Sequence, residues 1–96
     1  KHIAADGVKH YYLFGPLFFG STTTFLEKFD VSNDPEKVVL HFKESRLADM
    51  SALEAVNKLT SRYELVGKKL YLTDLSGDSR LLIRNAKELV KVNLLE

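Results

Sequence analysis

Two segments of the chain place hydroxyl and carboxylate side chains directly before a predicted helix. They are Asp49-Met50-Ser51 and Asp74-Leu75-Ser76-Gly77-Asp78. A hydroxyl at a helix N-terminus is a good phosphate acceptor, because the phosphoryl group adds roughly −1.5 to −2 charge where backbone N–H groups can stabilise it. Ser51 is therefore a candidate phosphorylation or regulatory site, together with the neighbouring Asp49.

The spacing around Ser51 also has a purely structural interpretation. Ser51-Ala52-Leu53-Glu54 has the form of a capping box, in which the serine side chain accepts a backbone N–H bond and Glu54 reaches back. Such a cap stabilises a helix by about 1 kcal/mol and accounts for the serine without any further function. The residues alone favour the cap and leave the regulatory interpretation open.

A metal site or an enzyme active site has weaker support. Asp49, Asp74 and Asp78 offer the oxygen ligands that Mg²⁺ prefers, but the helix dipole favours acidic residues near helix starts in any case. The three histidines show no helical metal-ligand spacing and no pairing with a serine nucleophile, and we expect His41 to be packed or hydrogen-bonded between the sheet and a helix. The sequence also has no glycine-rich nucleotide loop. We therefore predict no catalytic site, no bound metal and no cofactor.

Composition limits the class of protein further. The 96 residues correspond to a single domain with one hydrophobic core. A hydrophobic content of 45% and a charged content of 28% are typical of ordinary soluble globular proteins. The net charge of +1 argues against a nucleic-acid partner, which would require a strong basic excess. The chain has no cysteine, so disulfides and thiolate metal sites are excluded.

Large apolar side chains dominate the first predicted strand and the segment after it. Residues 8–14 carry large side chains on both faces, so we expect this strand to be covered on both sides for part of its length. The aromatic residues of this region lack the interleaved basic residues of a base-stacking surface. We expect them to pack in the core or at an interface: Tyr11, Tyr12, Phe14, Phe18 and Phe19.

Hydrophobic periodicity predicts strands that alternate with helices. Residues 38–42 are apolar without alternation, as in a central parallel strand, and a loop is expected over residues 43–49. The clearest helical spacing covers residues 51–65 and ends before Gly67, a suitable C-cap. After an opening hairpin, the predicted strands are 8–14, 38–42, 70–72 and 90–94, and the other predicted helices cover 21–30 and 79–86.

This order predicts an α/β fold, with a mixed, mostly parallel sheet, an opening hairpin and helices packed against the sheet. The carboxyl ends of neighbouring parallel strands form one rim, toward which helix N-termini point. We expect a partner-binding surface at this rim, with Met50 and Leu75 as exposed apolar anchors. The candidate residues are Met50, Ser51, Glu54, Leu75 and Ser76.

Several segments of the chain resemble a known family. Asp6-Gly7-Val8 and Leu13-Phe14-Gly15-Pro16-Leu17-Phe18-Phe19-Gly20 resemble the opening of STAS domains (sulfate transporter and anti-sigma factor antagonist) in SulP-type anion permeases. Asp49-Met50-Ser51-Ala52-Leu53-Glu54-Ala55 resembles the segment that begins the second main helix of the family. Residues 82–93 resemble its last short helix and closing strand. The resemblance extends over nearly the whole chain and predicts one STAS domain over residues 1–96.

The resemblance implies the cytosolic C-terminal domain of a bacterial SulP permease for sulfate, bicarbonate or dicarboxylate. Such a domain lies at the cytoplasmic face of the inner membrane, and the transmembrane part would precede Lys1. Domains of this kind are not enzymes and act in folding, trafficking, regulation and partner docking. The implied partners are the protein's own transmembrane domain, an acyl carrier protein or another cytosolic regulator, and a second copy of the domain.

The resemblance also leaves two other functions open. Ser51 falls where anti-sigma factor antagonists carry their phosphorylated serine, and Asp49 falls where they carry the preceding aspartate, so a free-standing phospho-switch is one alternative. Ala52 departs from the Gly-Leu-Gly that follows the serine in those regulators, which argues against kinase recognition. A nucleotide-sensing module is the other alternative, because nucleotide binding has been proposed for some members of the family.

Overall fold

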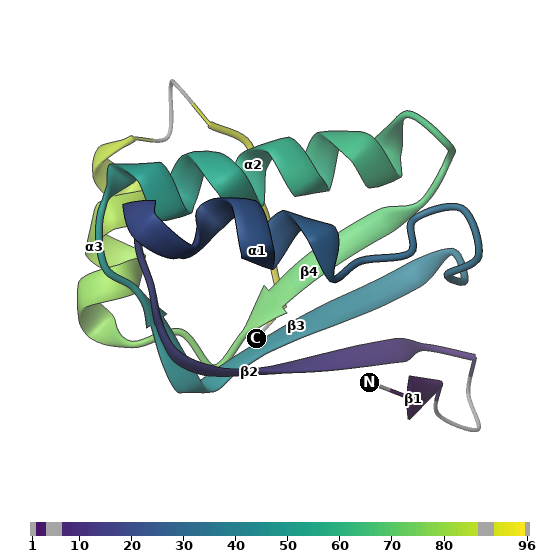
Figure 1. Cartoon of the computed structure of the whole chain (residues 1–96), viewed down its shortest axis with the longest axis horizontal. Helices are drawn as coiled ribbons and strands as arrows, with labels where there is room; N and C mark the ends of the chain where they lie inside the picture. The colour runs from purple at the N-terminus through teal and green to yellow at the C-terminus, as the bar shows by residue number, and fades with distance from the viewer. Residues whose placement is uncertain (1, 4–6, 87–89, 96) are drawn as a thin grey trace.

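The computed structural model describes residues 2–3, 7–86 and 90–95 of the chain (Figure 1). These residues form one five-stranded sheet in the order β1-β2-β3-β4-β5, in which β1 is antiparallel to β2 and the other pairs are parallel. The predicted α/β fold with an opening hairpin is therefore confirmed. The strands are β1 (His2–Ile3), β2 (Lys9–Leu17), β3 (Lys37–Leu47), β4 (Lys69–Thr73) and β5 (Asn93–Leu94), and the helices are the 3-10 turn η1 (Phe19–Ser21), α1 (Thr22–Glu27), α2 (Met50–Glu64) and α3 (Gly77–Asn85).

Strands β2 and β3 are longer than predicted. The expected loop over residues 43–49 is wrong for residues 43–47, because β3 continues to Leu47 beside β2. A bulge allows this: Tyr12 pairs with His41 but Phe14 pairs with Glu44, so β3 has one extra residue there. Conversely, the strand expected over residues 90–94 is confirmed only at Asn93–Leu94, and residues 87–89 lie outside the described part.

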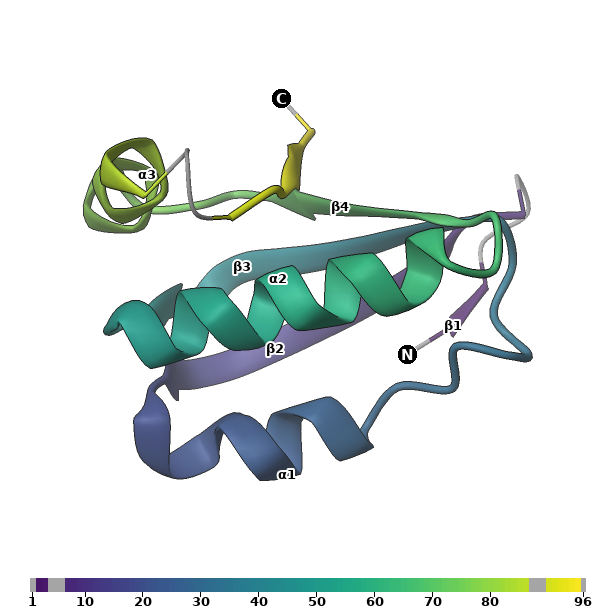
Figure 2. The same ribbon diagram turned by 90° about the horizontal axis from the view of Figure 1, so that it is seen from above.

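Helices α1 and α2 both lie on one face of the sheet (Figure 1). The strand order moves steadily in one direction from β2 to β4, and right-handed crossovers then place both connecting helices on the same side. Seen from above, α2 lies across the sheet and α1 lies beside β2 (Figure 2). The buried residues between the sheet and α2 include Tyr11, Val38, Leu40, Phe42, Ala52, Val56, Leu59 and Tyr63.

No helix of the described residues covers the opposite face of the sheet, which we call the open face (Figure 1). Its side chains come from the alternate positions of the strands, including Tyr12, Phe14 and His41. Phe14 is 78% exposed, and Tyr12 is also exposed. The predicted cover on both sides is therefore wrong at Tyr12 and Phe14, because both crossover helices occupy the other face (Figure 1).

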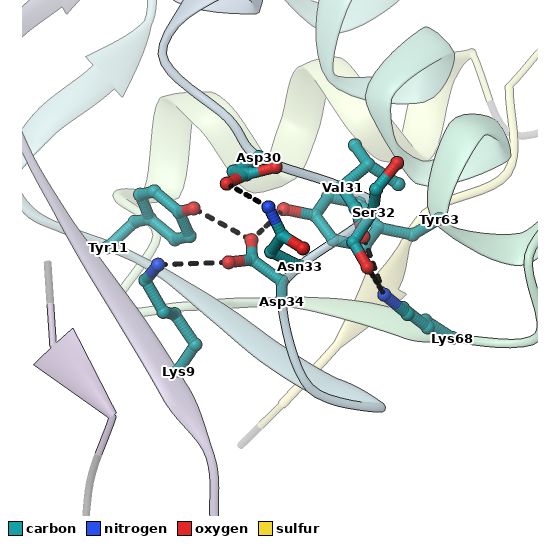
Figure 3. A network of polar contacts seen from close by, with 9 residues as sticks. All are labelled: Lys9, Tyr11, Asp30, Val31, Ser32, Asn33, Asp34, Tyr63 and Lys68. Atoms are coloured by element: carbon teal, nitrogen blue, oxygen red, sulfur yellow. Dashed lines mark hydrogen bonds and ion pairs between the residues drawn. The ribbon is translucent and has the colours of Figure 1, made fainter.

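A buried carboxylate connects β2, the loop before β3 and α2 (Figure 3). Asp34 is only 4% exposed, and it accepts hydrogen bonds from Tyr11 Oη at 2.7 Å, Tyr63 Oη at 2.5 Å and Lys9 Nζ at 2.9 Å. A buried charge requires such partners, because its desolvation would otherwise cost several kcal/mol. The segment Ser32-Asn33-Asp34-Pro35 before β3 is therefore a long-range anchor of the fold.

The partners of Asp34 determine how its carboxyl group ionises. Burial by itself raises the pKa of Asp34, but the hydrogen bonds from Tyr63, Lys9 and Tyr11 outweigh burial and lower the pKa below its usual 3.8. Burial and the hydrogen bond to Asp34 raise the pKa of both Tyr63 and Tyr11 above 10.0. The cluster therefore holds one carboxylate and two neutral phenols over a wide pH range.

Replacing Asp34 with Asn should lower the free energy of unfolding by about 2–4 kcal/mol at neutral pH, since the substitution removes the buried negative charge that faces Lys9. Because the pKa of Asp34 is depressed, its contribution is present above pH 3.8 and is lost as the pH falls through the folded-state pKa. The difference between wild type and D34N should therefore shrink below pH 3.8. Urea denaturation over a pH series measures both effects.

Glu27→Gln is the matched control for this charge removal, because Glu27 lies exposed on α1. It should change the free energy of unfolding by less than about 0.5 kcal/mol. A D34N protein as stable as wild type at neutral pH would contradict the anchoring role of the carboxylate.

Candidate docking surface

The starts of the three helices gather at one end of the molecule, on the left of Figure 1. They follow the carboxyl ends of β2, β3 and β4, which are parallel neighbours. The predicted rim at the carboxyl ends of neighbouring strands is therefore present. We define the rim as η1 together with the first turns of α2 and α3 and the residue before each of these two helices.

Asp49 connects two parts of the rim, η1 and the start of α2. Its backbone is extended and it caps α2, where Oδ1 accepts a hydrogen bond from the Ala52 N–H at 2.9 Å. Oδ2 accepts a second hydrogen bond from the Phe19 N–H at 3.0 Å, so the same carboxylate also holds η1. A negative charge at this position also interacts favourably with the positive end of the α2 dipole.

The capping box predicted for Ser51 and Glu54 is wrong. The helix begins at Met50, one residue earlier than expected, so Asp49 occupies the cap and Ser51 lies inside the first turn. Ser51 is half-buried and Glu54 is exposed. The Ser51 side chain is therefore not needed as the cap of α2, and it remains accessible from solvent.

The apolar residues predicted as anchors differ in exposure. Met50 is half-buried and packs against the core. Leu75 is only 9% exposed and belongs to the core, so its prediction as an exposed anchor is wrong. Asp74, the residue before Leu75, has a positive φ of 60°, so the backbone turns directly before Leu75 enters the core.

Serine hydroxyls position the start of α3. Ser76 caps the helix by accepting a hydrogen bond from the Ser79 N–H at 3.1 Å. The buried Ser79 Oγ in turn accepts a hydrogen bond from the Leu47 N–H at 3.0 Å. This contact links α3 to the end of β3 and so fixes the α3 part of the rim relative to the sheet.

The three aspartates considered as a magnesium site do not form one. Asp49 is engaged by backbone N–H groups, whereas Asp74 lies near His41, with 4.0 Å between Oδ2 and Nδ1. Asp78 is exposed in the first turn of α3. Within the described ranges no three histidine or acidic side chains converge on a point that could hold a metal ion.

The rim also contains exposed phenylalanines, which were expected in the core or at an interface but were not included in the predicted rim. Among the five aromatic residues considered from the sequence, only Tyr11 is buried in the core. Phe19 is 74% exposed in η1, and the preceding Phe18 is also exposed. Local sequence carries no signal for this exposure, because β2 continues through Gly15-Pro16 and stays paired with β3 as far as the buried Leu17.

A histidine pair was also missed. His10 Nδ1 and His41 Nε2 are 2.8 Å apart, although the two residues are 31 positions apart in the chain. The expectation that His41 packs between the sheet and a helix is wrong, because its ring lies on the open face against Tyr12. The alternation of residues in β2 and β3 could have placed both histidines on one face, but only the register brings them together.

Comparison with known proteins identifies the family. The family model described as "STAS domain" matches residues 3–94, so the chain belongs to the STAS family. STAS domains occur both as cytosolic domains of sulfate transporters and as anti-sigma factor antagonists, and they are generally regulatory and non-catalytic. No curated protein sequence matches the chain significantly. No helix of the described residues is long and apolar enough to cross a membrane.

Three solved structures share the fold. A sulfate transporter family protein from Wolinella succinogenes is 20% identical, with a TM-score of 0.71, and the match covers 98% of this chain and 80% of that one. The SulP transporter STAS domain from Vibrio cholerae is 18% identical, with a TM-score of 0.69 and coverage of 92% and 71%. An antisigma-factor antagonist STAS domain from Rhodobacter sphaeroides is 22% identical, with a TM-score of 0.66 and coverage of 74% and 78%.

Replacing Asp49 with Ala should lower the free energy of unfolding by about 1–2 kcal/mol, since the backbone N–H groups of Ala52 and Phe19 lose their acceptor. Ser51→Ala, two residues further along the chain, should change the free energy of unfolding by less than about 0.5 kcal/mol, because Ser51 is not the cap. Urea denaturation of both variants measures this contrast. A larger decrease in the free energy of unfolding in S51A than in D49A would show that the cap has been assigned to the wrong residue.

Proposed function

We propose that this STAS domain is the cytosolic regulatory and docking domain of a SulP-type secondary anion transporter. The transported anion would belong to the sulfate, bicarbonate or dicarboxylate class. In this proposal the domain is not an enzyme, and it lies at the cytoplasmic face of the bacterial inner membrane. It acts by recognising a partner with the rim.

The exposure of Phe19 beside the first turn of α2 is the observation that carries the proposal. Its side chain is 74% exposed, and its backbone N–H is held by Asp49, so the aromatic ring is presented from a fixed backbone. Neighbouring apolar surface comes from Phe18 and from the half-buried Met50. Exposed aromatic groups on a rigid support are typical of surfaces that bind a protein partner.

Two further observations favour the transporter class. The Gly15-Pro16-Leu17-Phe18-Phe19 segment, which builds the end of β2 and η1, is the part of the sequence that resembles SulP permeases. The matches to the two transporter structures also extend over 98% and 92% of the chain, compared with 74% for the antagonist. We infer that the primary partner is the transmembrane domain of the same protein, with an acyl carrier protein and a second copy of the domain as further candidates.

Phe19→Ser in the full-length transporter should reduce anion uptake several-fold, because it removes the exposed ring from the proposed docking surface. The isolated domain should keep its free energy of unfolding within about 0.5 kcal/mol, since the ring is not part of the core. Uptake of labelled sulfate, bicarbonate and dicarboxylate in cells is measured together with the amount of transporter in the membrane.

Leu65→Ser is the matched control, because Leu65 is 85% exposed but lies just beyond the other end of α2, away from the rim. It should leave uptake unchanged. If F19S transports every anion as well as L65S at equal abundance, the rim is not the docking surface.

A free-standing phospho-switch is the second candidate, and the half-buried Ser51 in the first turn of α2 is the observation that favours it. A phosphate there would interact favourably with the helix dipole. Ala52 occupies the position after the serine, so we expect an anti-sigma kinase with ATP to leave the domain unmodified. Intact-protein mass spectrometry checks this expectation. Stoichiometric modification of the wild type that disappears in Ser51→Ala would support the phospho-switch instead.

A further inference from the structure

The open face carries an imidazole pair that the proposed docking function does not use. His10 comes from β2 and His41 from β3, and the two rings meet end to end with 2.8 Å between His10 Nδ1 and His41 Nε2. The ring centroids are 5.0 Å apart. At this distance one nitrogen donates a proton and the other accepts it, so two ring nitrogens from different strands face a single shared position.

The groups around the pair hold His41 in a definite orientation. The ring of Tyr12 stacks on the His41 ring, with a centroid distance of 4.3 Å and an interplanar angle of 19°. Behind the ring, Asp74 Oδ2 lies 4.0 Å from His41 Nδ1. This distance is too long for a hydrogen bond, but the negative charge of Asp74 favours a positive ion bound at the imidazole pair.

The histidine pair is partly buried, and His41 borders a cavity that does not extend to His10. A cavity of about 170 Å³ on the open face is lined by Tyr12, His41 and Asp74, among other residues. In the β1–β2 pairing, the Cα of His2 lies opposite the Cα of His10. His41 lies diagonally across from His10 on the central strand, because His10 pairs with Val39 and Tyr12 pairs with His41.

We propose that His10 Nδ1 and His41 Nε2 bind a divalent transition-metal ion, such as Zn²⁺ or Ni²⁺, while the proton between them moves to the other nitrogen of the ring that carried it. Imidazole is a preferred ligand of these ions, whereas Mg²⁺ and Ca²⁺ prefer oxygen ligands. Zn–N bonds of about 2.0–2.1 Å in tetrahedral geometry place two nitrogens about 3.3 Å apart. The pair, now at 2.8 Å, has to open by only about half an ångström.

Water completes the coordination of the ion. No third histidine or acidic side chain of the described residues converges on the same point, so the site is an open, two-imidazole site. Such a site binds and releases its ion reversibly. The bound ion would join β2 to β3 on the face that no described helix covers, and it would stabilise the folded domain by mass action.

The test is a titration of the isolated domain with ZnCl2 or NiCl2, followed by the imidazole resonances in NMR spectra and by the melting temperature. We expect ZnCl2 to shift the resonances of His10 and His41 and to raise the melting temperature in a saturable way. MgCl2 at the same concentration should do neither. His10→Gln and His41→Gln should each weaken binding by at least about 10-fold, and Asp74→Asn should weaken it by a smaller factor.

His2→Gln is the matched control, because the terminal amino group of the isolated chain and the nearby His2 can bind metal ions by themselves. If binding survives in H10Q and disappears in H2Q, the ion is held by the chain terminus and the proposal is wrong. Absence of any His10 or His41 shift at millimolar ZnCl2 would overturn it equally. If H41Q fails to fold, H10Q alone tests the proposal, because either variant removes one of the two nitrogen ligands.

Discussion

Parallel pairing of β2, β3 and β4 is the constraint on which the rest of the molecule depends. After each strand the chain has to return to the same end of the sheet, and right-handed crossovers in a steadily advancing strand order bring both returning helices to one face. The helix starts therefore meet at one rim, while the open face keeps Tyr12, Phe14 and the histidine pair accessible. Both surfaces discussed for function result from this one topological fact.

Two buried or half-buried aspartates hold this arrangement at opposite ends of the strands. Asp34 accepts hydrogen bonds from Lys9, Tyr11 and Tyr63. These bonds connect the loop before β3 to both β2 and α2. Asp49 accepts hydrogen bonds from the N–H groups of Ala52 and Phe19, which connect α2 to η1. In both cases a carboxylate can accept several hydrogen bonds at once, which one serine or asparagine side chain cannot match. The fold therefore uses charge where two elements have to be held together.

The proposed docking surface and the proposed metal site make different demands on the chain. Docking at the rim requires exposed apolar groups on a rigid backbone, and Phe19 beside Asp49 meets this demand. Metal binding on the open face requires two nitrogen ligands from separate strands, and the β2–β3 register supplies them. The two sites use different residues and different faces, so each can be removed by substitution while the other stays intact.

The sequence by itself determined the fold class, the long helix and the rim, because periodicity, turn residues and the alternation of elements are local signals. It did not determine the cap of α2, the burial of Leu75, the exposure of Phe19 or the meeting of His10 with His41. The cap depended on where the helix begins, the burial of Leu75 on the turn at Asp74, and the exposure of Phe19 on the end of β2 at Leu17. The histidine contact depended on strand register, which joins residues 31 positions apart and leaves no trace in local spacing. Tertiary structure decided these points because long-range packing, and not local preference, sets which side chain faces which neighbour.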